Sequence, residues 1–320
     1  MIDITILGSG GGMPMPERFL SSFIISYKGR KILVDCGEGT QVAMKVNSTG
    51  FKAIDIIVIT HGHGDHINGL PGLLGTIGNS DRTEPLTIIG PYGIKALVAG
   101  LRVTAAYLPY EINIIEDPWE DIFVNLYEGI LVPLTKRQGK KAKTGEITIS
   151  TLGLNHSAPC LGYSFYIKRN PLFSKEKAEA NEVPKELWSR LQKGEELCYE
   201  GRLYKPSMVL GEERKGLKLS FITDSRPSKA IESFISNADL FVCEGNYGDD
   251  EDIEKAVANK HMTFREAATM ASNASVKKLL LTHFSPALTE PEKYVDNATS
   301  VFKDTMLAKD GLSLTLSFKE

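Results

Sequence analysis

The sequence predicts an α/β protein with an inserted helical arm. Short apolar runs rich in Ile and Val, each bounded by turn residues, dominate the chain before residue 157 and indicate strands. From about residue 218, similar runs alternate with amphipathic segments of helical period. Residues 168–216 lie between these parts, are dense in Lys, Arg and Glu, and are too long for an ordinary connection. We therefore expect one domain over residues 1–320 that carries residues 168–216 as an inserted arm.

The individual elements follow from the lengths and periods of these runs. Strands are predicted over residues 2–8, 21–27, 31–37, 53–60, 86–90, 112–117, 121–127, 146–156, 218–224, 239–245, 277–286 and 312–318. Amphipathic helices are predicted over residues 228–236, 263–274 and 291–306. Within the arm, residues 183–197 predict one short helix with Leu187, Trp188 and Leu191 on its apolar side. The alternative is that the arm packs on the domain as a solvated helical pair.

Composition excludes several classes of protein. The 320 residues are 42% hydrophobic and 24% charged, which argues against a disordered protein, a collagen and a coiled coil. The chain has no run of about 18 apolar residues and begins without the features of a signal peptide, so we expect a cytoplasmic protein and no membrane partner. The net charge is only −3, so an RNA partner would be held by a local patch or a metal site.

The candidate metal site begins where an apolar strand runs into a turn rich in histidine. Residues 56–66 are IIVITHGHGDH, and glycines at 62 and 64 allow a tight backbone path. The candidate ligands in this turn are His61, His63, Asp65 and His66. The four cysteines have no CxxC spacing, so they suggest neither a thiolate zinc site nor a disulfide framework.

Three further candidate ligands stand at the ends of predicted strands. They are His156, Asp224 and His283. The carboxyl ends of strands are where α/β sheets place ligand-binding groups. A lone residue of this kind is more often structural, but together with the first cluster these three supply the number of ligands that two ions need. Imidazole and carboxylate suit zinc, so we expect two Zn²⁺ per chain, with Mn²⁺ or Fe as alternatives.

Stretches spread along the whole chain resemble one known family. THGHGDH at 60–66 matches the HxHxDH motif of the metallo-β-lactamase superfamily. Within it the chain resembles the ribonuclease Z branch, the tRNA 3′-processing endonucleases, through DCGEGTQ at 35–41 and the pairing of Glu244 with His261. Further matching stretches are LGSGGGMP (7–14), NHSAPCLGY (155–163), FITDSRPS (221–228), CEGNY (243–247), HMTFREAATMA (261–271) and LTHFSPA (281–287).

The resemblance implies a four-layer αββα metallo-β-lactamase sandwich with metals at one edge, and it assigns roles to site residues. The first metal is implied to be held by His61, His63, His156 and a bridging Asp224, and the second by Asp65, His66, Asp224 and His283. Asp65 is implied as general base, and His261, oriented by Glu244, as proton donor to the leaving oxygen. Each of the six histidines thus has an expected task.

The implied activity is that of an endoribonuclease that removes the 3′ trailer of precursor tRNA through a bridging hydroxide. Two dications lower the pKa of the water between them, and an imidazolium can protonate a ribose 3′-oxygen as it leaves. The resemblance also implies a homodimer in which residues 168–216 form an RNA-binding exosite that grips RNA for the partner's site.

Residues beside the ligands are candidates for supporting roles. Asp35 ends a predicted strand and is expected to hold the second ring nitrogen of a ligand histidine, the alternative being a turn residue. Thr60, Ser225 and Arg226 are expected phosphate contacts. For Arg226 the alternative is an ordinary surface arginine.

Two departures from the family pattern leave other substrates open. Residues 183–187 are Val-Pro-Lys-Glu-Leu where the family arm carries Gly-Pro-Leu, and residues 284–287 are Phe-Ser-Pro-Ala where the family continues to Ser-Arg-Tyr. The alternative is a two-metal phosphodiesterase that acts on cyclic nucleotides or another RNA. A non-catalytic metal-binding protein is disfavoured because Glu244 and His261 go beyond the ligands. Lactonase or β-lactamase activity is more distant.

Overall fold

A computed structural model of the chain describes residues 1–134 and 145–318. It divides into two compact units, Met1–Ile167 with Leu217–Glu320, and Lys168–Gly216. Among the described residues, no helix has the length and apolar character needed to cross a membrane.

The first sheet of the larger unit contains seven strands in the order β17-β1-β2-β3-β4-β5-β6. Their bounds are β1 (Ile2–Gly8), β2 (Ser22–Tyr27), β3 (Arg30–Val34), β4 (Ile54–Val58), β5 (Leu86–Gly90), β6 (Ile112–Glu116) and β17 (Ser313–Leu316). Strands β3 to β6 are parallel, whereas β17, β1, β2 and β3 pair antiparallel.

The second sheet contains eight strands in the order β16-β15-β14-β13-β10-β9-β7-β8. Their bounds are β7 (Ile122–Tyr127), β8 (Ile130–Leu134), β9 (Ile147–Gly153), β10 (Leu161–Arg169), β13 (Arg214–Ile222), β14 (Leu240–Glu244), β15 (Leu279–Thr282) and β16 (Thr305–Leu307). Strands β13 to β16 are parallel. Because parallel strands end at the same edge of a sheet, residues that follow β13, β14 and β15 come together there.

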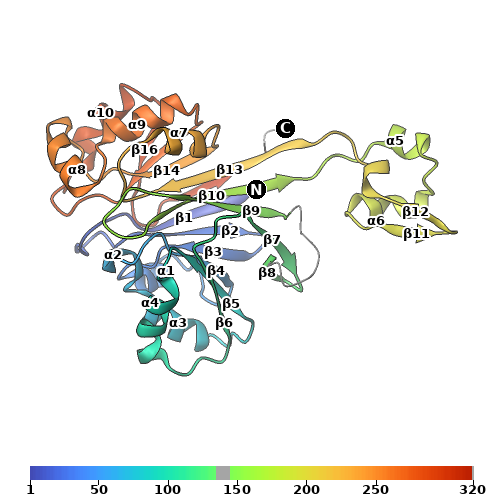
Figure 1. Cartoon of the computed structure of the whole chain (residues 1–320), viewed down its shortest axis with the longest axis horizontal. Coiled ribbons are helices and arrows are strands. Elements are labelled where there is room, and N and C mark those ends of the chain that lie inside the picture. The colour runs from blue at the N-terminus through green and yellow to red at the C-terminus, as the bar shows by residue number, and fades with distance from the viewer. Residues whose placement is uncertain (135–144, 319–320) are drawn as a thin grey trace. The chain divides into compact units, whose positions relative to one another are not determined.

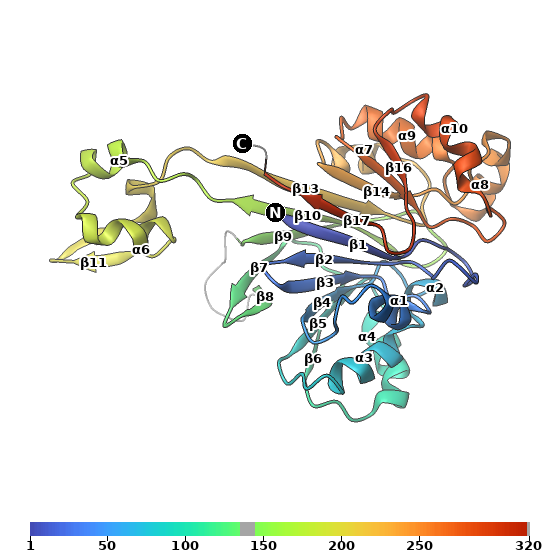
Figure 2. The same ribbon diagram turned by 180° about the vertical axis from the view of Figure 1, so that it is seen from behind.

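Helices cover the outer face of each sheet, as Figures 1 and 2 show. The first sheet is covered by α1 (Thr40–Val46), α2 (Gly64–Ile67), α3 (Leu70–Gly78) and α4 (Ile94–Leu101), and the second by α7 (Lys229–Ile235), α8 (Ile253–Asn259), α9 (Phe264–Asn273) and α10 (Val295–Thr299). One apolar core joins the facing sides of the two sheets with α7 and α9, and another lies between the first sheet and its helices. The predicted four-layer αββα sandwich is confirmed.

The smaller unit has an apolar core of its own. It contains α5 (Lys175–Ala180), α6 (Trp188–Gln192) and the two-stranded sheet of β11 (Leu197–Tyr199) and β12 (Arg202–Tyr204). Leu187 and Leu191 are buried, and Trp188 packs against them with one face partly exposed. The predicted helix over 183–197 is shorter in the structure: a 3₁₀ turn over Lys185–Leu187 precedes α6, and Gly194 with φ 95° follows it.

Local sequence gave a wrong helix prediction near the C-terminus and no prediction for helix α3. The helix expected over residues 291–306 is only a 3₁₀ turn, Pro291–Tyr294, followed by α10, and residues 305–307 form strand β16 instead. Val301 and Phe302 pack against the core, and the chain then pairs with β15. Conversely, the LPGLLGTIG sequence of α3 has low intrinsic helix propensity and predicts no helix; the segment is helical because its apolar face is buried.

Candidate metal centre and active site

Three residues of the site leave their strands in the left-handed backbone region. Asp35 after β3, Asp224 after β13 and His283 after β15 have φ values of 55°, 45° and 57°. Residues other than glycine seldom adopt this conformation, and where they do it is often at functional sites. In each case the turn brings the side chain into one cluster at the edge of the two sheets.

The turn after β4 brings the other candidate ligands to the same edge. His63 is the N-cap of α2, and its carbonyl accepts a hydrogen bond of 3.0 Å from the backbone N–H of His66. The glycines keep this turn closely packed: a β-carbon would lie 2.6 Å from Cδ1 of Leu97 at Gly62 and 2.6 Å from Nδ2 of Asn68 at Gly64, so these side chains would have to move.

The first ligand set contains His61, His63, His156 and Asp224. Nδ1 of His63 lies 3.0 Å from Nε2 of His61 and 3.2 Å from Nε2 of His156. Oδ2 of Asp224 lies 3.7 Å from the Nε2 atoms of both His61 and His156.

The second ligand set contains Asp65, His66 and His283, with the other oxygen of Asp224 beside them. The Nε2 atoms of His66 and His283 are 3.1 Å apart. Oδ1 of Asp224 lies 3.4 Å from the first and 3.2 Å from the second. Oδ2 of Asp65 lies 3.4 Å and 3.3 Å from the same two atoms.

These separations fit two bound metal ions. A tetrahedral zinc with bonds of about 2.0–2.1 Å has ligand atoms about 3.3–3.4 Å apart. The observed 3.0–3.7 Å brackets that spacing in both sets, and Asp224 offers a different oxygen to each. Nδ1 of His63 also faces the Nε2 atoms of both His61 and His156. In a neutral ring this nitrogen has either one proton or one lone pair, so it can form a good hydrogen bond with only one of them. A cation would satisfy them together.

The electrostatics of the cluster also favour a cation. Burial and the neighbouring His66 lower the pKa of His61 to about 2, so its ring is neutral and its lone pair available. Burial opposes ionisation of Asp224, but His283, His66 and His61 outweigh it and hold its pKa well below the ordinary value. Hydrogen bonds from His283 and His66 likewise lower the pKa of Asp65 despite burial. Ionised carboxylates and neutral imidazoles are the forms that bind metal. The charges of Asp224 and Asp35 outweigh burial and raise the pKa of His66 well above its ordinary value, so a metal ion would take the place of the proton on that ring.

Asp35 and Thr60 lie behind the ligands. Oδ2 of Asp35 is 2.7 Å from Nδ1 of His66, and its Oδ1 accepts the backbone N–H of Thr60 at 2.8 Å. Thr60 is fully buried, and its hydroxyl donates to Asp35 at 3.0 Å. The hydroxyl proposed from sequence as a phosphate contact is therefore turned into the protein.

The loop of residues 9–19 packs against the second ligand set. The backbone N–H of Gly12 donates to Oδ2 of Asp65 at 2.7 Å. A β-carbon on Gly11 would lie 2.4 Å from Cε1 of His283, so the backbone at Gly11 sets one wall of the site. This loop is anchored by residues far away in the sequence.

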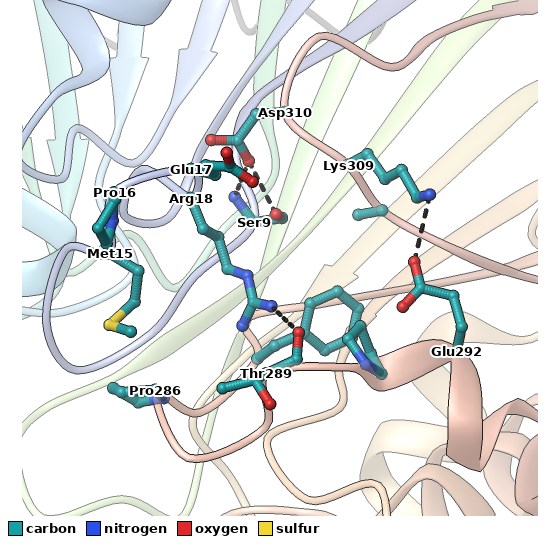
Figure 3. Close-up of a pocket in the computed structure, with 13 residues that line it drawn as sticks. Ser9, Met15, Pro16, Glu17, Arg18, Pro286, Thr289, Glu292, Lys309 and Asp310 are labelled. Atoms are coloured by element: carbon teal, nitrogen blue, oxygen red, sulfur yellow. Dashed lines mark hydrogen bonds and ion pairs between the residues drawn. The ribbon is translucent and has the colours of Figure 1, made fainter.

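Asp310 anchors the loop beside a cavity of about 590 Å³, drawn in Figure 3, and Arg18, which belongs to the loop, binds a second distant segment. Oδ1 of Asp310 accepts the backbone N–H and the hydroxyl of Ser9, at 2.9 Å and 2.8 Å, and its Oδ2 accepts the N–H of Phe19 at 2.6 Å. Arg18 donates to the carbonyl oxygen of Leu288 at 3.0 Å and so ties the loop to the segment that follows His283. Asp310 lies in a Lys-Asp-Gly stretch that carries no sequence signal for this role.

Comparison with known proteins identifies the family. A Clostridium beijerinckii protein named ribonuclease Z is 60% identical over 321 residues and covers 100% of both chains. The ribonuclease Z of Alkaliphilus oremlandii is 55% identical over 320 residues, again with 100% of both chains covered. The chain belongs to the ribonuclease Z family. Membership confirms the predicted family and the predicted enzyme class, a hydrolytic endoribonuclease.

Other comparisons agree on the fold. Human tRNase Z, short form, has a TM-score of 0.66 at 23% identity, with 99% of this chain and 100% of that chain covered. A long form RNase Z from yeast has a TM-score of 0.65 at 20% identity, over 98% of this chain and 41% of that chain. Residues 2–192 match the family model of anti-Pycsar protein Apyc1, so the chain also falls within the family that this model describes. That match ends before Asp224.

His261 lies beside both ligand sets. Its ring centroid is 5.8 Å from that of His156 in one set and 5.7 Å from that of His283 in the other. Its Nδ1 lies 3.0 Å from Oε2 of Glu244, which is fully buried at the end of β14. Burial lowers the pKa of His261, but the hydrogen bond and charge of Glu244 outweigh this effect and raise it above the ordinary value.

Ser225 and Arg226 make contacts other than those expected. Ser225 is fully buried, and its hydroxyl donates to the carbonyl oxygen of Arg226 at 3.1 Å. The guanidinium of Arg226 pairs with Glu266 and donates to the carbonyl oxygen of His261. The capping-box pattern Thr-x-x-Glu at 263–266 could have marked Glu266 as a helix-start residue, but no local pattern pairs it with an arginine 40 residues earlier.

Proposed function

We propose that this chain removes the 3′ trailer of precursor tRNA, with divalent metal ions, two Zn²⁺ by preference, held by the two ligand sets. When bound, such ions supply a water of lowered pKa and neutralise charge on the phosphoryl oxygens. The ligands would be His61, His63 and His156 on one side, Asp65, His66 and His283 on the other, and Asp224 between them. The family names and the fold support this proposal.

The observation that carries the proposal is the position of His261. Both ligand sets are complete without His261. It lies near enough to Asp224 and His283 to form a candidate ligand group with them, but its Nδ1 is bonded to buried Glu244 and its ring lies beside both sets. Its raised pKa favours the imidazolium, so Nε2 carries a proton that it can donate to a ribose 3′-oxygen. The carboxylate of Asp65, held by the N–H of Gly12 at Oδ2, would accept the proton of the attacking water. The product is a tRNA with a 3′-hydroxyl.

The arm and the assembly complete the proposal. Lys168–Gly216 would bind the body of the tRNA as an exosite, since this unit folds around its own core and exposes lysines and arginines. In a homodimer it would serve the partner's site. The proposed place of action is the cytoplasm.

The deciding experiment incubates the purified protein, reconstituted with Zn²⁺, with a tRNA precursor that carries a 3′ trailer. The expected product is the tRNA without its 3′ trailer, and it carries a 3′-hydroxyl. His61→Ala serves as the inactive control, and bis-p-nitrophenyl phosphate serves as a small diester. Turnover of the small diester without cleavage of the precursor would overturn the tRNA assignment and favour the phosphodiesterase alternative.

A further inference from the structure

Three consecutive residues connect the metal centre with the proton donor. Asp224 contributes to both ligand sets, and the backbone N–H of Ser225 donates to Oε1 of Glu244 at 2.7 Å. Nη1 of Arg226 then donates to the backbone carbonyl of His261. The loop after β13 therefore contacts, in order, the ligands, the carboxylate that orients the proton donor, and the proton donor's own backbone.

The guanidinium of Arg226 is occupied within the protein. It forms a bidentate pair with Glu266: Nη1 lies 3.0 Å from Oε2, and Nη2 donates to Oε1. Only 19% of the Arg226 side chain and 21% of the Glu266 side chain are exposed. Bidentate pairs of this kind hold both partners in a defined geometry. The carboxylate also neutralises the guanidinium and would repel a phosphate that approached it.

Glu266 is itself fixed to the start of helix α9. Its Oε2 accepts the backbone N–H of Thr263 at 3.0 Å, and its own N–H donates to the hydroxyl of Thr263 at 3.3 Å. These two bonds form the capping box of α9. His261 lies just two residues before Thr263, so Arg226 binds both the segment that carries His261 and the helix that follows it.

We propose that Arg226 is a positioning residue for His261 and not a phosphate contact. Glu244 holds the ring of His261 at Nδ1, and Arg226 holds its backbone at the carbonyl oxygen. The backbone N–H of His261 also donates to the carbonyl oxygen of Ala256 at 2.8 Å, and the N–H of Met262 donates to Oε2 of Glu244 at 3.2 Å. Arg226 adds the anchor at the carbonyl side of His261, and its loss would let this side of the segment, and with it Nε2, shift. The inference rests on the proposed function in that His261 is taken as the proton donor.

The test compares substrates that differ in their need for a proton. The leaving 3′-oxygen of a tRNA precursor requires protonation, whereas p-nitrophenolate leaves without it. Arg226→Gln should lower kcat on the precursor about tenfold or more, because general acid catalysis contributes about 10²–10⁴-fold. Its KM, its metal content and its turnover of bis-p-nitrophenyl phosphate should be unchanged.

Two further variants sharpen the result. Glu266→Gln breaks the ion pair but keeps a residue that supports the capping box, and it should show the same selective loss. Arg265→Gln is the matched control. Arg265 also lies in α9, but its side chain pairs with Asp250 in another segment, so its loss should leave the turnover of both substrates unchanged.

Opposite results would overturn the inference. If Arg226 contacts phosphate, Arg226→Gln raises KM for both substrates, and Glu266→Gln lowers KM by releasing the guanidinium. Equal losses on both substrates, accompanied by lost metal, would indicate a role in folding alone and would also refute it.

Failure of the proposed function gives a different pattern. Wild-type protein that turns over bis-p-nitrophenyl phosphate but leaves the tRNA precursor intact refutes the tRNA assignment only. The positioning role of Arg226 is then tested by measuring rates on a series of aryl phosphodiesters whose leaving groups differ in basicity. The rate of Arg226→Gln should fall more steeply with basicity than that of the wild type, and parallel slopes would refute the positioning role.

Discussion

Oδ2 of Asp35 lies 2.7 Å from Nδ1 of His66, and both side chains are completely buried. A carboxylate at the second ring nitrogen orients a ligand imidazole and strengthens it as a donor. Asp35→Asn keeps the shape but removes the charge, so we expect metal affinity to fall about 10–100-fold. Competition with a chromophoric chelator measures it.

Asp55 provides the control for this prediction. It is as buried as Asp35 but pairs with Arg30 and Arg82, far from the ligands. Asp55→Asn should lower the free energy of unfolding by about 3–5 kcal/mol and leave the metal affinity of the folded protein unchanged. Equal metal affinities for Asp35→Asn and the wild type would contradict the role given to Asp35.

A substitution at Gly11 tests whether the close contact between the loop of residues 9–19 and His283 is needed for metal binding. A β-carbon there would lie 2.4 Å from the ring, so Gly11→Ala must move the ring or the loop. We expect the protein to keep its affinity for the metal ion of the first ligand set and to bind the metal ion of the second ligand set more weakly. Calorimetric titration should then show one tightly bound metal ion per chain.

The same substitution at Gly75 should stabilise the protein and leave metal binding unchanged. Gly75 lies in helix α3, and a β-carbon there meets no atom within 4 Å. Gly75→Ala should therefore raise the free energy of unfolding by about 0.5–1 kcal/mol and leave both metal equivalents in place. Denaturant titration measures the gain.

Glu244 makes the pH dependence of cleavage predictable. The proton donor must be protonated, so the rate falls as pH rises through the pKa of His261. Glu244 raises that pKa, and Glu244→Gln removes the charge, so the alkaline limb of the rate profile should move to lower pH. In His261→Ala the limb attributed to this residue should disappear while the metal content remains. An unshifted limb in Glu244→Gln would assign it to another group.

Asp310 should affect metal binding from outside the ligand cluster. Its carboxylate accepts three donors from Ser9 and Phe19, and an amide in its place would present N–H groups to at least one of them. Asp310→Asn should therefore loosen the loop that carries Gly12 and weaken the second metal selectively. Asp3→Asn, which alters an exposed hydrogen bond to Thr315, is the control. Equal weakening of both metals would argue for a general loss of stability.

The sequence by itself determined the class of the site. Ligand types and their spacing are local, and four of the candidates fall in one turn. Asp224 and His283 follow parallel strands, which bring chain segments together at one edge of the sheet, and His156 follows the antiparallel strand β9. Most strands of the two large sheets were predictable because burial imposes their apolar runs, although β8, β10 and β16 were missed. Helix α3 was not, because its glycine-rich sequence is helical only through burial against the sheet.

Tertiary structure alone decided what the polar groups around the ligands do. Arg226 has the charge of a phosphate contact, but its partners lie 35 and 40 residues away and have already taken its guanidinium. Asp310 reaches a loop 301 residues distant, where a carboxylate accepts several donors at once. The residue type determines which hydrogen bonds a side chain can form. The folded structure determines which partners lie within about 3 Å of it.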